Sequence, residues 1–168
     1  MLQHPVPARL LVHVGDITVS FALLESTIQT LAGSLIAEHQ RIGQIITAEL
    51  AFRNLRALTI SLYKERHGED IDFAALRDLM KHAADLEEKR NQITHSLWGA
   101  GDTADTVTRI KTTAREKHGI RFHFVNVGEQ DLAGVANELK QLAADVQALW
   151  IRLLEAGKAI NNPGQKVW

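Results

Sequence analysis

Hydrophobic residues recur along most of the chain at alternating spacings of three and four, which is the period of one face of an α-helix. The last such stripe runs through Leu132, Val135, Leu139 and Leu142. The stripes predict four long helices, at about residues 16–38, 42–66, 71–98 and 129–158. Long helices with narrow stripes at heptad-like spacing are typical of antiparallel bundles.

The period changes between the third and fourth predicted helices. Apolar residues from Ile120 to Phe124 alternate with Arg121 and His123, which is the spacing of a β-strand. We therefore predict a β-hairpin at about 105–127. The expected fold is all-α, a four-long-helix bundle with this hairpin inserted between helices 3 and 4.

Length and composition limit the class of protein. A chain of 168 residues suits a single domain, here residues 1–168. It has no cysteine, which excludes disulfides and thiolate zinc sites. We see no secretion signal at Met1–Pro5 and no run of the roughly 20 apolar residues that cross a bilayer. The expected protein has no membrane span and is cytoplasmic.

Charge is distributed unevenly along the chain. The whole chain carries −1, but residues 106–127 hold five basic residues and one acid, Glu116, a local charge of +4 that leaves −5 on the rest. The basic residues are Arg109, Lys111, Arg115, Lys117 and Arg121. They are candidates for contact with RNA phosphates; alternatively, they only keep an edge strand soluble.

One arginine interrupts the apolar stripe of the third predicted helix. The stripe positions are Leu76, Leu79, Ala83, Leu86, Arg90, Ile93 and Leu97. A guanidinium stays protonated in a protein, and burying it without a partner costs several kcal/mol. Arg90 therefore needs a carboxylate, a set of carbonyls or a bound anion, and we expect it to be mostly buried against an acid, Glu25 first and Glu49 second.

Two polar neighbours accompany this arginine. Asn91 and His95 are four residues apart, so their side chains adjoin on a helix, whereas Arg90 and His95 lie about 140° apart around the axis. Such a set suits RNA cleavage by its own 2′-hydroxyl. His95 would move a proton, Arg90 would hold the phosphate and Asn91 would orient either group. We expect no metal and no other cofactor.

These three residues resemble the motif of the HEPN superfamily, an arginine followed by a polar residue and, four to six positions on, a histidine near the end of a bundle helix. The resemblance implies a homodimer with two motifs around one cleft. It also implies a metal-independent endoribonuclease of a toxin, defence or RNA-processing system, with an antitoxin or other partner protein. The alternatives are a non-catalytic HEPN-like module that binds a nucleotide or partner, and a plain helical scaffold. A second match, Arg77-Asp78 with His82, lies mid-helix and off the stripe, and we interpret it as solvated charge.

A second apolar strip on the third predicted helix bears on the homodimer. It comprises Met80, Ala84 and Trp98, on a different face from the stripe. A bundle helix needs only one apolar face, so the strip favours a dimer contact near these residues and Asn91. The alternative is that Trp98 packs under the hairpin.

Overall fold

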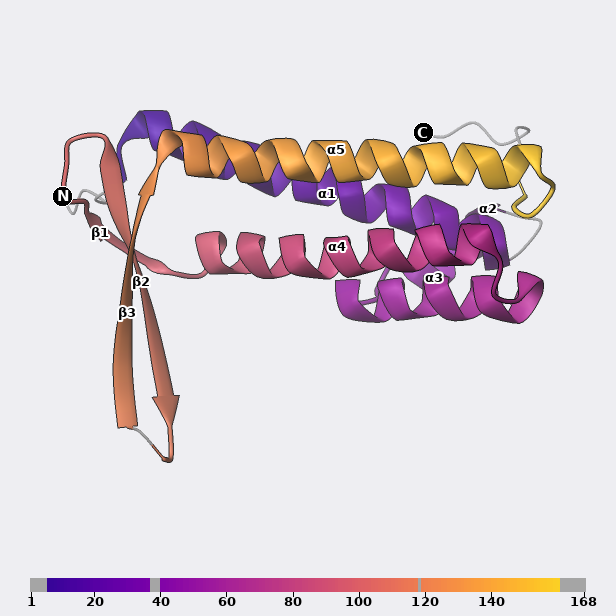
Figure 1. Ribbon diagram of the computed structural model, residues 1–168, viewed down its shortest axis with the longest axis horizontal. Helices are drawn as coiled ribbons and strands as arrows, with labels where there is room; N and C mark the ends of the chain where they lie inside the picture. The colour runs from indigo at the N-terminus through magenta and orange to yellow at the C-terminus, as the bar shows by residue number, and fades with distance from the viewer. Residues whose placement is uncertain (1–5, 37–39, 118, 161–168) are drawn as a thin grey trace. The chain divides into compact units, whose positions relative to one another are not determined.

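The computed structural model describes residues 6–36, 40–117 and 119–160, apart from the side chains of Gln40 and Arg115. Within these residues the chain forms five helices and one three-stranded antiparallel sheet (Figure 1). In order, the elements are α1 (Ala8–Ile36), α2 (Gln40–Thr47), α3 (Phe52–His67), α4 (Ile71–Thr94), β1 (Leu97–Ala100), β2 (Thr106–Arg115), β3 (Gly119–Gly128) and α5 (Glu129–Glu155).

The predicted four-helix bundle with a two-stranded hairpin is therefore wrong. The second predicted helix, 42–66, is two helices, because the backbone at Ala51 is extended (φ −58°, ψ 143°) and ends the helical geometry between α2 and α3. The third, 71–98, stops at Thr94, because Leu97–Ala100 pair with β2 as a third strand.

The outer limits also differ from the prediction. The first helix, predicted over 16–38, starts eight residues earlier, at Ala8, and the predicted end at 38 lies outside the described residues. The fourth, predicted to reach 158, ends at Glu155. Gly157 follows with a φ of 69°, a conformation that favours glycine and ends the helix.

The chain divides into two compact units. The first unit contains the described residues up to Phe21 together with Leu86–Leu139; the second contains Ala22–Asp85 and the described residues from Lys140. Helices α1, α4 and α5 contribute to both.

The first unit packs three helix segments and the sheet around one apolar core. Its fully or almost fully buried side chains include Leu10, Ile17, Leu86, Ile93, Val107, Leu132 and Leu139. The strand order is β1-β2-β3. In Figure 1, β2 and β3 run side by side, and together they are called the ribbon below.

The second unit contains α2, α3 and the remaining parts of the other helices. Its core includes Leu24, Ile28, Leu31, Leu55, Tyr63, Leu76, Met80, Leu142 and Val146. Helix α2 comes so close to α1 that a Cβ added to Gly43 would lie 2.5 Å from the Cα of Gly33. Glycine at position 43 permits this contact.

A polar cluster in the second unit holds the residue that caps α4. The Asp70 carboxylate accepts a hydrogen bond from the backbone N–H of Phe73 at 2.9 Å. It also accepts one from Lys158 Nζ at 2.7 Å and another from the Tyr63 hydroxyl at 3.1 Å. The Lys158 ammonium, followed by the Phe73 N–H, lowers the Asp70 pKa to about 2. Lys158 Nζ also bonds Asp72 at 2.6 Å, so it joins the segment after α5 to the start of α4.

The exposed side of helix α1 carries apolar side chains in addition to the single apolar stripe that the sequence predicted. By length and composition it could cross a membrane, and 28% of its most apolar window is buried. Core helices of soluble proteins meet the same criteria, so the expected cytoplasmic location stays a prediction.

Candidate functional site

The end of α4 places the three motif residues in the first unit. Arg90 is half-buried, and its guanidinium carbon lies 4.8 Å from the centre of the Phe21 ring of α1. Its Nη1 donates a hydrogen bond to the Oδ1 of Asn91 at 2.8 Å. The aromatic face and the amide oxygen both stabilise a positive charge.

The predicted carboxylate partner of Arg90 is not found in this unit. Arg90 forms no ion pair among the described residues, and its buried Nε has no described hydrogen-bond partner. Glu25 and Glu49 belong to the second unit, where Glu25 is half-buried and Glu49 exposed, and neither forms an ion pair among that unit's described residues. Within the first unit the Arg90 guanidinium therefore contacts an aromatic ring, and its pairing with Glu25 or Glu49 stays a prediction.

His95 follows the last residue of α4 and is exposed. Its backbone N–H donates to the carbonyl of Asn91 at 3.0 Å, which continues the helical turn and keeps the two residues adjacent. The imidazole makes no hydrogen bond to any described residue, so it is open to a ligand from solvent.

Gln92 links the motif to the sheet, which the sequence analysis missed. Its Oε1 accepts a hydrogen bond from Arg109 Nη1 at 2.6 Å, and its Nε2 donates to Glu88 at 3.0 Å. One predicted RNA-contacting arginine therefore reaches the end of α4. No sequence signal marks this contact, since the two residues are 17 positions apart.

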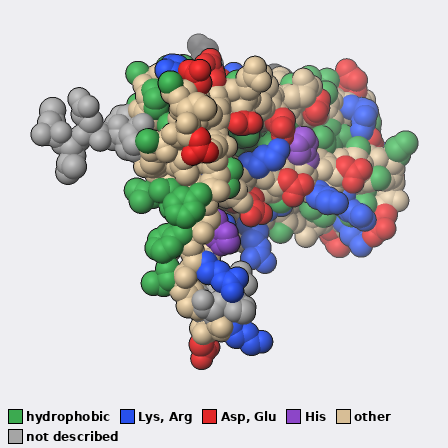
Figure 2. All heavy atoms as spheres, turned by 60° about the vertical axis from the view of Figure 1, so that its left-hand side comes forward, with side chains coloured by type: hydrophobic (Ala, Val, Ile, Leu, Met, Phe, Trp, Pro, Cys, Tyr) green, Lys and Arg blue, Asp and Glu red, His purple; other side chains and the backbone are tan. Residues whose placement is uncertain are grey.

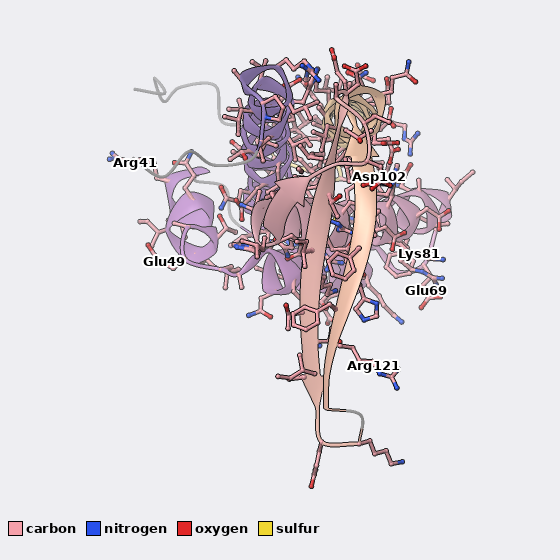
Figure 3. All side chains as sticks on the ribbon, turned by 90° about the vertical axis from the view of Figure 1, so that its left-hand side faces the viewer. Arg41, Glu49, Glu69, Lys81, Asp102 and Arg121 are labelled. Carbon is pink, nitrogen blue, oxygen red and sulfur yellow. The ribbon has the colours of Figure 1, made fainter. Side chains whose placement is uncertain are left out.

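The register of the sheet gives the ribbon two chemically different faces. Alternating residues point to opposite faces and paired residues share one. Arg109 pairs with Val125, Lys111 with His123 and Thr113 with Arg121, so three predicted RNA-binding residues lie on one face. We call Arg109, Lys111, Arg121 and His123 the basic face. Figure 3 shows Arg121 extending to one side of the ribbon.

The remaining two predicted RNA contacts are Lys117 and Arg115. Lys117 lies in the turn between the strands and is exposed. The side chain of Arg115 lies outside the described residues.

His123 is a second histidine of interest, and the sequence analysis did not propose it as a site residue. It stands opposite Lys111 on the basic face, with its Nε2 3.4 Å from the Thr113 hydroxyl. The strand alternation that groups His123 with Arg121 was a sufficient sequence signal.

The basic face turns toward the helices of its own unit. At its base this face carries Val107, which is 1% exposed, and further out Arg109 bonds Gln92 of α4. The opposite face, with Phe122 and Phe124, points away from that core. Figure 2 shows hydrophobic side chains along one side of the ribbon and Lys and Arg on the other.

The second motif match lies in the second unit, beside a surface pocket. Asp78 and His82 line this pocket of about 460 Å³ together with Asp145 and Arg152. Among the described residues, no three His, Asp or Glu side chains gather as a metal site would need.

The surface proposed for the dimer contact needs a correction. Met80 is fully buried in the core of the second unit, so it cannot contact a partner. Trp98 is half-buried in the first unit and donates from its indole to the carbonyl of Ile93 at 3.2 Å. Met80 is therefore excluded from the predicted contact. A dimer contact near Ala84, Asn91 and Trp98, which are half-buried, stays a prediction.

Comparison of the chain with protein-family models, curated proteins and solved structures finds no match. The resemblance to the HEPN superfamily consequently rests on Arg90, Asn91 and His95 alone.

Proposed function

We propose that the chain is a HEPN-like endoribonuclease that cleaves RNA without a metal ion. The observation that carries the proposal is the exposed His95 imidazole next to Asn91, whose amide holds the guanidinium of Arg90. A proton-transfer group and a fixed cation on one helix end are the two functions that cleavage by a 2′-hydroxyl requires.

In this mechanism the RNA supplies its own nucleophile. The 2′-oxygen attacks the adjacent phosphorus as its proton leaves, and the 5′-oxygen departs with a proton, which leaves a 2′,3′-cyclic phosphate. His95 serves as the acid or the base in one of these transfers, typically worth roughly 10²–10⁴-fold in rate. Arg90 offsets the charge that develops on the phosphoryl oxygens, and no carboxylate within the described part of its unit competes for it.

The basic face supports binding of the RNA next to this site. Arg109 is bonded to Gln92, one residue from Asn91, so the row of cations begins at the end of α4. Lys111 and Arg121 continue the row along the ribbon. Phosphates bound along it would lead the RNA toward His95.

An RNA-cleavage assay in EDTA, with purified protein, tests this proposal. We expect cleavage to persist in EDTA and to be lost in His95→Ala. His82→Ala, the histidine of the second motif match, is the matched control and should retain activity. A requirement for Mg²⁺, or equal loss in both variants, would contradict the mechanism.

The second candidate is a non-catalytic module that binds a nucleotide or a partner protein. The stacking of Arg90 on Phe21 favours it, because a guanidinium held in this way also has a structural role. Retained RNA or nucleotide binding without cleavage, unchanged in His95→Ala, would support this candidate.

A further inference from the structure

The outward face of the sheet is apolar and uncovered. By register, Leu97, Ile110 and Phe124 lie side by side, and Phe122 and Ile120 follow toward the tip of the ribbon. The exposed fractions are 71% for Leu97, 67% for Ile120, 59% for Phe122 and 66% for Phe124. We call these four residues the apolar face. A two-stranded ribbon is marginal in water on its own, so covering this face would stabilise it.

A pocket opens at the base of this face. Its volume is about 420 Å³, and it is lined in part by Gly99, Ile110, Phe124 and Asn126. The Thr108 hydroxyl donates to Asn126 Oδ1 at 2.7 Å, which occupies the polar groups at its edge. An apolar side chain from a partner would fit beside Phe124.

Helix α1, which begins in the same unit, exposes a second apolar surface, and this surface ends at Leu23, just inside the second unit. Val12 is 68% exposed, Val19 70% and Leu11 39%. Gly15 lies on the same side, and a Cβ built there meets nothing within 4 Å. Successive residues of α1 are rotated by about 100° around the helix axis. The arc of this surface, bounded by Thr18 on one side and Leu23 on the other, is therefore roughly 140° wide. This arc, from Ala8 to Leu23, contains no charged residue, and we call it the α1 arc.

We propose that two copies of this chain cover these surfaces for one another, the apolar face of each ribbon lying on the α1 arc of the other copy. One twofold contact then buries both surfaces and needs no second kind of partner. The phenylalanines meet no charge on the α1 arc, while the basic face stays free on the other side. The inference does not depend on the proposed RNA cleavage.

The dimensions of the two surfaces agree. Ile120 to Phe124 spans roughly 13 Å at the rise of a strand, and Val12 to Val19 spans roughly 10 Å at the rise of a helix. A fully exposed large apolar side chain has an area on the order of 150–200 Å². Scaled by the exposed fractions, the side chains of the apolar face and the α1 arc together have roughly 800 Å² of exposed area per copy that a partner could bury. A standard stable interface buries about 800 Å² per partner.

Charge also favours a second copy as the occupant. Residues 106–127 carry +4 and the rest of the chain −5. A ribbon is therefore attracted to the body of another copy, which steers the two chains together at low salt.

The absence of native cysteines provides a direct test. Val19→Cys and Phe122→Cys proteins, differently tagged, are mixed and oxidised, and each is also oxidised alone. We expect a disulfide between the two different chains in the mixture, at least several-fold more abundant than a disulfide between two copies of the same variant. Predominant linkage within either variant, position 19 to position 19 or position 122 to position 122, would show that like surfaces pair. That result would overturn the proposed contact between the apolar face of one copy and the α1 arc of the other.

Light scattering at tens of micromolar provides the second measurement. The unmodified protein should have twice the chain mass of 18.7 kDa. Phe122→Gln combined with Phe124→Gln should shift it to the monomer, whereas His123→Gln, on the opposite face, should not. A monomeric unmodified protein would overturn the inference. So would sedimentation with phosphatidylcholine vesicles that Val19→Ser abolishes, since α1 would then contact lipid.

Discussion

Arg90 illustrates how one residue can satisfy a core position in an unexpected way. Its place in the apolar stripe correctly indicated that part of the side chain is buried, but the charge rests on the Phe21 ring and the Asn91 amide. A ring has no net charge, so losing Arg90 does not leave a buried carboxylate unpaired. The destabilisation expected on removing Arg90 is accordingly smaller than for a broken buried ion pair.

We expect Arg90→Met to lower the free energy of unfolding by about 1–2 kcal/mol, from the lost cation–π contact and hydrogen bond. In a double-mutant cycle with Phe21→Leu, urea unfolding should give a coupling energy of about 0.5–2 kcal/mol. His95→Ala, at an exposed position, should stay within about 0.5 kcal/mol. Zero coupling would show that the ring does not stabilise the guanidinium.

Asp70 provides a residue-scale test of the second unit. Its pKa falls from 3.8 to about 2, chiefly because of Lys158 and then the Phe73 N–H. The folded pKa is the lower one, so the stabilisation is complete above pH 3.8 and is lost as the pH falls toward 2.

In thermal melts between pH 2 and 6, the melting temperature of the native protein should therefore decrease as the pH is lowered below about 4. Asp70→Asn should melt earlier at pH 6 and depend less on pH below 4. Glu49→Gln, at an exposed acid without a described ion pair, is the control and should keep the native profile. An unchanged profile in Asp70→Asn would contradict the role of this carboxylate.

At the scale of elements, apolar periodicity predicted where helices occur but not where two of them break. The residues between α2 and α3 are Ala48, Glu49, Leu50 and Ala51, which include no glycine or proline to mark an end. Strand β1 was missed for a similar reason. Four residues are too few to show an alternation, and only pairing with β2 makes them a strand.

The candidate site also combines features that the sequence predicts with features that it does not. Arg90, Asn91 and His95 could be grouped from helical spacing, because their relation is local. The contacts of Arg90 with Phe21 and of Gln92 with Arg109 join distant parts of the sequence, so only the tertiary structure reveals them.

The close packing of α2 on α1 gives an element-scale prediction. Gly43→Ala would place a Cβ 2.5 Å from the Gly33 backbone, and helix backbones cannot move as a flexible side chain does. We expect a loss of about 1–3 kcal/mol in the free energy of unfolding.

Gly15→Ala makes the same chemical change in α1, where the added Cβ meets nothing within 4 Å. It should stabilise the helix by up to about 1 kcal/mol. Equal effects of the two substitutions in urea unfolding would rule out the packing argument.

For the whole molecule, an acidic body and a basic ribbon predict how the proposed RNA binding should respond to salt. Replacing Arg109, Lys111 and Arg121 together by Gln should weaken RNA binding. It should also reduce the slope of log K against log salt by about 2, at roughly 0.7 per phosphate contact on a single strand. Arg53, Arg77 and Lys81, exposed in the second unit, form a control set of the same composition. Equal loss in both sets would indicate that binding depends on net charge and not on the basic face.

The two-faced ribbon also restricts how its length can change. Side chains alternate with a period of two, so inserting one residue into β3 between Arg121 and Phe124 would turn every following residue to the opposite face. Aromatic rings would then point at the helices and cations at the outward side. An insertion of two residues in each strand preserves both faces and only extends the ribbon. Functional relatives of this chain should consequently differ in ribbon length by even numbers per strand, with odd changes confined to the turn.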